Sequence, residues 1–284
     1  MALYVVATPI GNLQDLSPRA IETLKSADVI LAEDTRVTMK LCQVFDLHAR
    51  LISCHRHNER ERADALAEEI QRENWICSLV TDAGTPCISD PGNEVVRACV
   101  ERGIPVLPVP GCCAGIAAVS ISGFDAREFA FYGFLPREKK DLREKLRTII
   151  EGPKVAILHE SPFRIIELTE TLAEIMPQAK LTVCCDLTKK HEKTLYGTPE
   201  AVLALLRNNE KTEKGEYCVV LDLHDIPREL PKEQQSPLSM EARLVETMKE
   251  GMSLRDAQNE LILQGEKKNA VKHAALALKS MFSE

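Results

Sequence analysis

The residues with the clearest potential for chemistry form a short acidic run near the end of an apolar segment. Glu33 and Asp34 stand side by side, and Arg36 follows two positions later. Neighbouring carboxylates can divide acid and base roles when their environments move their pKa values apart. A second interpretation stays open for Asp34, because its side chain can cap a helix that follows Thr35. The run predicts either general acid–base chemistry or helix capping for these carboxylates.

A second polar cluster holds His55, His57 and Glu59 within five residues. On a loop or at a helix start this spacing does not converge on one ion, and a metal needs a third or fourth converging ligand. The cysteines add no metal site, because the chain lacks Cys-x-x-Cys and its adjacent pairs, 112–113 and 184–185, have the wrong spacing. We therefore predict no bound metal.

Glycine and proline gather at the ends of several strand-like segments, where they allow backbone to approach a flat ligand. The strings are ATPIGN at 7–12, TDAGTPCISDPG at 81–92 and VPGCCAG at 109–115. The chain has neither G-x-G-x-x-G nor G-x-x-x-x-G-K-[ST], so no nicotinamide site or Walker-type phosphate loop is indicated. Few side chains here could hold phosphates, which favours a neutral or cationic nucleoside-like ligand. Further along, Glu160 and Ser161 could cap a helix that begins near Pro162.

Alternating strands and helices position these loops. The expected strands are 3–7, 29–32, 50–53, 76–81 and 105–109, and the expected helices are 17–25, 38–45, 59–73 and 92–102. This alternation is typical of a mostly parallel sheet with helices on its faces. The loops at the carboxyl ends of such strands build the ligand crevice.

A second α/β pattern and a helical tail follow. Strands are expected at 128–134, 154–159, 181–186 and 217–223, with helices at 139–150, 162–175 and 199–207. Three prolines interrupt the next stretch, and short helices are expected at 240–250, 254–264 and 269–282. The pattern predicts an α/β domain at 1–123, a second at 124–226, a linker at 227–239 and a small helical segment at 240–284.

Composition sets the class and the compartment. The 284 residues include 36 basic and 43 acidic side chains, a net charge of -7, and 44% are hydrophobic, as in an ordinary globular protein. No apolar run is long enough for a membrane span, and the first residues do not resemble a secretory signal. The ten cysteines lie mostly in apolar stretches and are interpreted as reduced core residues. We expect a cytoplasmic protein with neither a membrane nor DNA as partner.

One local basic stretch stands out against the acidic total. Residues 136–147 carry six basic and three acidic side chains. The acidic total argues against bulk binding of nucleic acid but does not exclude a local patch. A solvated helix face with opposite charges three or four positions apart explains the stretch equally well.

Seven strings, in order along the chain, resemble one known family. They are VATPIGNLQDLSPRA (6–20), AEDTR (32–36), HRHNE (55–59), VTDAGTPCISDPG (80–92), GFLP (133–136), ESPFR (160–164) and LTKKHE (187–192). The chain is similar to the bacterial 16S ribosomal RNA cytidine 2'-O-ribose methyltransferases, the ribosomal small-subunit methyltransferase I family of the tetrapyrrole methylase superfamily. The chain departs from the family pattern at Cys112, usually Pro, at Phe163, usually His, and at Cys185-Asp186, usually Arg-Glu.

The resemblance implies a fold and a reaction. Two α/β domains of the tetrapyrrole methylase type would enclose S-adenosylmethionine in a cleft, with a helix-turn-helix-like C-terminal segment, usually as a homodimer. The methyl group would go to a cytidine 2'-hydroxyl of 16S rRNA, in the decoding region of the small ribosomal subunit. The positions that match the family's cofactor loops are Gly84, Thr85, Pro86, Ile88, Cys113, Ala114, Leu135, Glu160 and Ser161, with a helix starting at Cys113 and Ala114. Asp82, Asp90 and Gly92 are expected to shape the loop.

The reaction needs a base and groups that hold RNA. A ribose hydroxyl is a poor nucleophile, and a carboxylate that accepts its proton could contribute roughly a hundredfold or more. We predict that Glu33, Asp34 and Glu59 include this base, with Arg36 and His57 positioning ribose or phosphate. Lys189 is the alternative base.

The tail offers a further hypothesis. Lys267, Lys268, Lys272 and Lys279 could give an auxiliary contact to RNA, because phosphate contacts depend on cationic side chains. Alternatively, the short helices are only a cap packed on the core.

Two other functions are alternatives to RNA methylation. Methylation of a small tetrapyrrole is disfavoured, because acids at the cleft mouth would repel its many carboxylates. A non-catalytic ribosome-binding module would show no thermal shift with S-adenosylmethionine.

Overall fold

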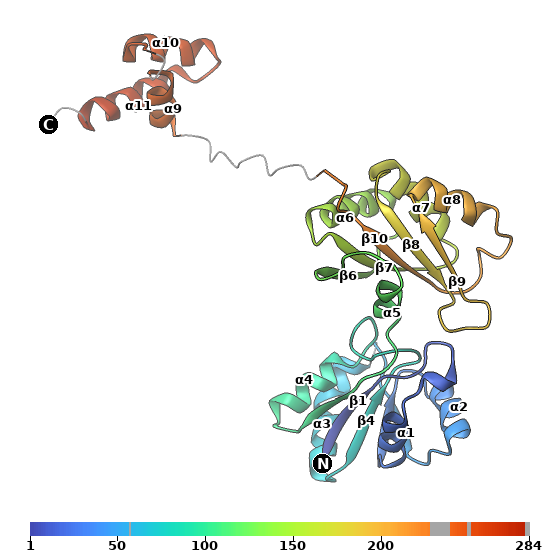
Figure 1. Cartoon of the computed structure of the whole chain (residues 1–284). Helices are drawn as coiled ribbons and strands as arrows, with labels where there is room; N and C mark the ends of the chain where they lie inside the picture. The colour runs from blue at the N-terminus through green and yellow to red at the C-terminus, as the bar shows by residue number, and fades with distance from the viewer. Residues whose placement is uncertain (57, 228–238, 249–250, 282–284) are drawn as a thin grey trace. The chain divides into compact units, whose positions relative to one another are not determined.

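The computed structural model describes residues 1–56, 58–227, 239–248 and 251–281 (Figure 1). Two compact units make up the chain, Met1–Pro227 and Arg228–Glu284. His57 and most of the predicted linker lie outside the described residues. Within the described ranges, no helix has the length and apolar character needed to cross a membrane.

The first sheet of the large unit is entirely parallel. Its strands are β1 (Ala2–Val6), β2 (Val29–Ala32), β3 (Arg50–Ser53), β4 (Ile76–Val80) and β5 (Val106–Val109), in the order β3-β2-β4-β1-β5. Every neighbouring pair of strands is parallel. The carboxyl ends of all five strands therefore meet at one edge of the sheet, as predicted from the sequence.

Helices cover both faces of this sheet because successive side chains of a strand point to opposite sides. Ile30 packs with α1 (Pro18–Lys25) and α2 (Thr35–Phe45), whereas its neighbour Leu31 packs with α3 (Glu59–Arg72) and α4 (Asn93–Glu101). A short 3-10 helix, η1 (Leu13–Asp15), follows β1. The result is a three-layer α/β lobe.

The second sheet is mixed. Its strands are β6 (Phe129–Phe134), β7 (Val155–Glu160), β8 (Lys180–Cys185), β9 (Lys193–Gly197) and β10 (Tyr217–Asp222), in the order β6-β7-β10-β8-β9. Only β6 and β7 are parallel, and the other pairs are antiparallel. Helices α6 (Lys139–Glu151), α7 (Ile165–Ile175) and α8 (Pro199–Arg207) pack on one face.

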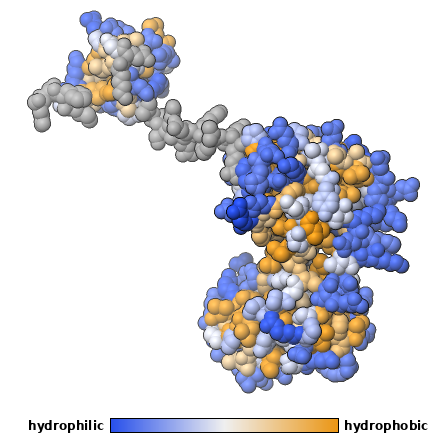
Figure 2. All heavy atoms as spheres, in the orientation of Figure 1, coloured by the Kyte–Doolittle hydropathy of each residue, from blue (hydrophilic) through white to orange (hydrophobic). Residues whose placement is uncertain are grey.

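Helix α5 (Ala114–Ser120) packs on the opposite face of the second sheet through Ala118, which meets Ile157 and Val220 (Figure 1). This helix follows β5 and so connects the two lobes. Figure 2 shows apolar residues on the surface of both lobes near the place where they meet.

The predicted fold class, two α/β parts with a helical tail, is confirmed. The predicted strands agree with the observed ones to within a residue or two at either end. Strand β9 was not among the expected elements, and α5 begins at the helix start that the resemblance implies at Cys113 and Ala114. The predicted start of α7 near Pro162 is wrong, because residues 161–164 form a turn in which the Arg164 N–H donates to the Ser161 carbonyl. Arg164 is the N-cap and no side chain caps this helix, so the capping interpretation of Glu160 and Ser161 is also wrong.

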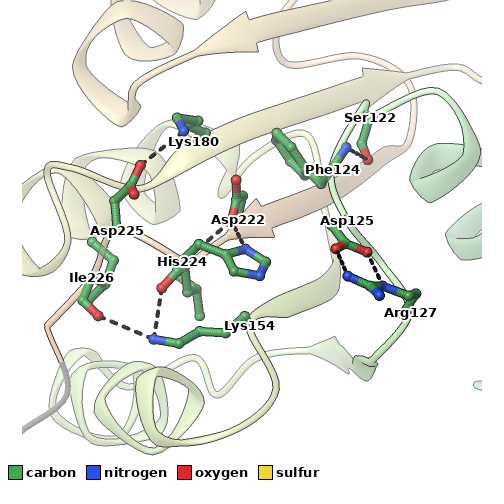
Figure 3. A network of polar contacts seen from close by, with 11 residues as sticks. Ser122, Phe124, Asp125, Arg127, Lys154, Lys180, Asp222, His224, Asp225 and Ile226 are labelled. Carbon is green, nitrogen blue, oxygen red and sulfur yellow. Dashed lines mark hydrogen bonds and ion pairs between the residues drawn. The ribbon is translucent and has the colours of Figure 1, made fainter.

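Polar contacts fix the last residues of the large unit (Figure 3). Lys154 Nζ donates to the carbonyls of Leu223 at 3.1 Å and Ile226 at 3.3 Å. Lys180, the first residue of the neighbouring strand β8, pairs with Asp225 at 2.9 Å. These bonds hold the chain in a defined path beyond the end of β10.

The small unit contains α9 (Met240–Met248), α10 (Leu254–Leu263) and α11 (Lys268–Met281), which confirms the expected tail helices. They share a core of their own, including Leu244, Leu261 and Val271. The four lysines of the tail hypothesis, Lys267, Lys268, Lys272 and Lys279, are all exposed.

Candidate active site

A cavity of about 350 Å³ lies between the two lobes of the large unit, and is called here the interlobe cavity. Its volume falls within the range of small-molecule sites. The lining residues come from the strand-end loops of the first lobe and from the α5 side of the second sheet. They are Ile10, Ala83, Ser89, Asp90, Ala114, Phe134, His159, Glu160, Ser161, Pro162, Cys184, Leu187, Glu216, Tyr217 and Cys218.

Backbone hydrogen bonds hold the loops that form the first lobe's wall. Thr8 and Gly84 exchange N–H to carbonyl bonds of 2.9 and 3.1 Å. Gly84 has φ +93°, a conformation that residues with a Cβ rarely adopt. The Thr85 hydroxyl donates to the Cys112 carbonyl at 2.9 Å. The loops after β1, β4 and β5 are thus tied together.

The second lobe's wall presents buried polar atoms without partners. Glu160 is 2% exposed; its Oε1 accepts the Ser161 N–H at 2.7 Å, and among the described residues its Oε2 has no hydrogen-bond partner. His159 Nε2 is likewise unpartnered within that part of the chain, and its ring meets the edges of Phe131 and Phe134. Burial raises the pKa of Glu160 and lowers the pKa of His159. Because an unpaired buried polar group costs free energy, these atoms point to a ligand.

The lining fits the cofactor that the resemblance implies. It contains the carboxylates of Asp90, Glu160 and Glu216 but no lysine or arginine. Glu216 pairs with Lys189 at 3.0 Å and Glu160 with Arg164 at 3.6 Å, and both cations lie outside the lining. The remaining acceptor atoms suit a ligand that carries amine and hydroxyl donors, as S-adenosylmethionine does. Glu160 Oε2 and His159 Nε2 are the atoms available to hold it.

The predicted cofactor residues occupy different places around the cavity. Ala114, Glu160 and Ser161 line it. Cys113 is the N-cap of α5, and Pro86 is buried in the loop after β4.

Two more of the predicted cofactor residues lie with their side chains away from the lining. Ile88 is 55% exposed. Leu135 belongs to the second lobe's core, and its carbonyl accepts from Arg164 at 3.3 Å.

Asp34 is occupied by local contacts. Its side chain caps α2 by accepting a hydrogen bond from the Arg36 backbone N–H at 2.8 Å. It also accepts hydrogen bonds from two side-chain nitrogens of Arg36, at 2.6 to 3.1 Å. These hydrogen bonds lower the pKa of Asp34 from 3.8 to about 2. A carboxylate with so low a pKa is a weak base, so the capping interpretation describes Asp34 well.

Glu59 is occupied at the start of another helix. Its side chain is buried, and Oε1 accepts the N–H groups of Gly92 at 2.8 Å and Glu94 at 2.6 Å. Gly92 is the N-cap of α4 and has no side chain to satisfy these donors. Glu59 therefore caps α4 from a distance and fixes the end of the 81–92 loop.

The carboxyl groups of Glu33 and Asp90 lie on either side of the Thr81 hydroxyl. The Thr81 hydroxyl donates to Glu33 Oε2 at 2.5 Å. Burial raises the pKa of Asp90, and the charge of Glu33 raises it further, while a contact with the Thr81 hydroxyl lowers it. Asp90 lines the interlobe cavity, so the string SDPG held a site residue that sequence reasoning had assigned to loop shape alone.

The 187–192 loop of the second lobe meets the 7–12 loop of the first. The Asn12 N–H donates to Thr188 Oγ1 at 3.1 Å, and Gly11 packs so closely that an added Cβ would lie 2.5 Å from Lys189 Cγ. Lys189 Nζ donates to Asp186 at 3.1 Å and Glu216 at 3.0 Å. Burial alone would lower the pKa of Lys189, but these bonds raise it, so Lys189 is a cation at the cavity edge.

Two family departures lie outside the cavity lining. Phe163 is 79% exposed, in the turn before α7. Cys112 contacts the Asp15 carbonyl through its Sγ at 3.7 Å. At the third departure, Cys185 on β8 lies opposite Tyr217 on the neighbouring strand β10. All ten cysteines are free thiols, as predicted.

The comparisons with known proteins agree with this geometry. The family model "Tetrapyrrole (Corrin/Porphyrin) Methylases" matches residues 2–202. A Ribosomal RNA small subunit methyltransferase I of Synechocystis sp. is 41% identical, over 91% of both chains. The protein of that name from Haemophilus influenzae is 38% identical, over 97% of this chain and 96% of its own.

Solved structures share the fold of the large unit. Diphthine synthase aligns with a TM-score of 0.58 and 15% identity, over 78% of this chain and 90% of its own. Uroporphyrin-III C-methyl transferase from Thermus thermophilus, in complex with S-adenyl homocysteine, aligns with a TM-score of 0.55 and 17% identity, over 78% and 97%. S-adenosylmethionine, predicted from the sequence, is the methyl donor of this methylase family. The strand-end loops, the interlobe cavity and the relatives at about 40% identity lead to one conclusion: the chain belongs to the ribosomal RNA small subunit methyltransferase I family of the tetrapyrrole methylases.

Proposed function

We propose that this chain transfers the methyl group of S-adenosylmethionine to the 2'-hydroxyl of a cytidine in 16S rRNA, in the decoding region of the small ribosomal subunit. The observation that carries the proposal is the interlobe cavity, which is lined by three carboxylates and contains Glu160 Oε2, a buried atom with no hydrogen-bond partner among the described residues. The names of the curated relatives support ribosomal RNA as the substrate.

The chain's main task is positioning. When bound, S-adenosylmethionine supplies a methyl group that its sulfonium has already activated. The two lobes enclose the cavity, and the contact of Asn12 with Thr188 holds them together at its edge. Excluding water and aligning the hydroxyl with the methyl carbon can contribute several kcal/mol to the barrier reduction.

Asp90 is the carboxylate best placed to accept the hydroxyl proton. A base must first be within reach of its proton, and its pKa matters second. Asp90 lines the interlobe cavity, whereas Glu33 and Asp34 do not. The pKa of Asp90 is raised by burial and by the charge of Glu33. Glu33 is then a positioning residue that acts through Thr81 and through its charge.

One cation from each lobe suits the RNA backbone. Arg36 has an 88% exposed side chain that Asp34 holds beside the start of α2. Lys189 keeps its charge through Asp186 and Glu216. Arg36 and Lys189 would approach phosphates of the RNA, while Glu33 and Asp90 would approach the sugar.

The proposal includes the assembled small subunit as substrate, a cytoplasmic location and a homodimer. The decisive experiment measures methyl transfer from labelled S-adenosylmethionine to purified small subunits and then maps the modified ribose. Methylation of a cytidine 2'-oxygen is expected. Modification of a base atom would overturn the proposed chemistry. Absence of a thermal shift with the cofactor would instead favour the non-catalytic module.

A further inference from the structure

A second cavity, of about 300 Å³, opens on the first lobe and is called here the α2 cavity. Three residues at helical spacing on α2, namely Val37, Leu41 and Val44, form one wall. The loop after β1 forms the other. The full lining is Thr8, Pro9, Leu13, Val37, Thr38, Lys40, Leu41, Val44, Thr81 and Asp82.

The α2 cavity lies directly beside the interlobe cavity. Thr81 and Asp82 line the α2 cavity, and the next residue, Ala83, lines the interlobe cavity. Consecutive Cα atoms are about 3.8 Å apart, so the two linings meet at neighbouring residues of the loop after β4. A nucleotide whose sugar meets Asp90 could therefore place its base in the α2 cavity.

The chemistry of the α2 cavity suits a flat ring with a donor group. Its apolar wall is open to solvent, since Val37 is 38% and Val44 59% exposed. Asp82 Oδ1 accepts the Asp34 N–H at 3.1 Å, and no hydrogen bond within the described part of the chain engages its Oδ2. Lys40 also lines the cavity and gives a cation for a phosphate at the rim.

We infer that the α2 cavity binds the cytosine base of the target nucleotide, and that Asp82 Oδ2 accepts a hydrogen bond from its exocyclic amine. The inference rests on the proposed function and adds a specificity-determining residue to it. Cytosine presents an amine donor where uracil presents a carbonyl acceptor, and a carboxylate can accept only from the former. The charges also match, with Asp82 for the amine and Lys40 for phosphate.

The substitution Asp82→Asn tests the recognition step. The amide oxygen can still accept the Asp34 N–H, while the new NH2 group donates and so suits uracil. Small subunits are prepared with cytidine or uridine at the mapped position, and methyl transfer to each is compared. We expect the preference for cytidine over uridine to fall about tenfold or more. An unchanged preference, with the wild-type enzyme active, would overturn the role of Asp82.

A pair of tryptophan variants tests the cavity itself. Val44→Trp fills the α2 cavity, whereas Met39→Trp adds the same group to α2 at an exposed position outside the lining. We expect Val44→Trp to lower methyl transfer at least tenfold relative to Met39→Trp, with the same thermal shift on adding S-adenosylmethionine. Equal transfer by the two variants would place the base elsewhere.

A binding measurement separates this inference from the proposed function. Cytidine 5'-monophosphate is titrated into the whole protein, and the NMR signals of the Val37, Leu41 and Val44 methyl groups are followed. These signals should shift with cytidine monophosphate and shift less with uridine monophosphate. In Val44→Trp, the Val37 and Leu41 signals should stay unchanged. If subunits are not methylated but the shifts occur, the proposed reaction fails while the site stands. If subunits are methylated and millimolar nucleotide gives no shift at these methyl groups, the base site in the α2 cavity is wrong while the proposed reaction stands.

Discussion

The Thr81 hydroxyl donates a 2.5 Å hydrogen bond to Glu33 Oε2, and this bond joins the carboxyl ends of β4 and β2. The two strands are neighbours in the sheet, although 48 residues separate the partners along the chain. The bond keeps the negative charge of Glu33 close enough to Asp90 to raise the pKa of that carboxyl. The carboxylate of Glu33 thus raises the pKa of Asp90 at the wall of the interlobe cavity.

Asp90→Asn should lower the single-turnover rate of methyl transfer about a hundredfold or more, because an amide cannot accept the hydroxyl proton. In the wild-type enzyme the rate should rise with pH through the raised pKa of Asp90, since only the ionised carboxylate is a base. Rapid-quench assays across pH provide the measurement. Asp34→Asn is the comparison variant: because Asp34 holds Arg36, it should weaken RNA binding more than it lowers the single-turnover rate at saturating RNA. A large loss of that rate in Asp34→Asn and none in Asp90→Asn would move the base to Asp34.

Glu33→Gln should shift the acidic limb of the pH–rate profile to lower pH. Removing the Glu33 charge removes a cause that raises the pKa of Asp90, so Asp90 ionises at lower pH. A carbon-detected NMR titration of the Asp90 carboxyl checks the same shift without turnover. Glu101→Gln, at the far end of α4, should leave the profile unchanged. A limb that stays in place would mean that another group controls it.

Glu59→Ala should destabilise the fold by about 1–3 kcal/mol, because two N–H groups at the start of α4 lose their acceptor. Urea unfolding measures the change in the free energy of unfolding. Glu59→Gln keeps an oxygen at the same place and should cost less. If Glu59→Ala unfolds like the wild type but loses methyl transfer, Glu59 acts in the chemistry rather than in the fold.

The contrast between Glu59 and Asp90 shows what the sequence could and could not reveal. The strand–helix alternation gave the parallel sheet, because strand and helix periodicities are local properties. The orientation of the Glu59 carboxylate toward Gly92 depends on packing between segments 33 residues apart, which no local pattern contains. Asp90 likewise gains its place in the cavity only when the loop after β4 and the end of β7 meet around it.

Two elements that the sequence pattern alone does not predict have simple causes. Helix α5 is only seven residues long and rich in alanine and glycine, so its apolar periodicity is too short to detect. Strand β9 is a partly exposed edge strand with one leucine among polar residues, so alternation is weak. Tertiary contacts with the second sheet stabilise both.

Gly11→Ala should weaken binding of S-adenosylmethionine roughly tenfold, because the two loops must move apart to make room for the alanine side chain. The added Cβ would lie 2.8 Å from Thr188 Oγ1 and 3.1 Å from the Leu187 carbonyl, besides its clash with Lys189. Leu187 lines the interlobe cavity, so its displacement changes the cofactor site. Calorimetry gives the dissociation constant. Full affinity in this variant would show that the contact between the 7–12 and 187–192 loops does not shape the cavity.

Replacing Lys267, Lys268 and Lys272 together by Gln should weaken binding to small ribosomal subunits while leaving cofactor affinity unchanged. The three side chains are exposed on the small unit, and the described lining of the interlobe cavity belongs to the large unit. Each lost phosphate contact lowers the slope of log affinity against log salt by roughly 0.7–0.9, so a shallower salt dependence distinguishes direct RNA contact from lost stability. Lys25→Gln, at the exposed end of α1, serves as the control. If the triple variant binds subunits with the wild-type affinity and salt slope, the tail helices act as a structural cap and the RNA contact lies on the large unit.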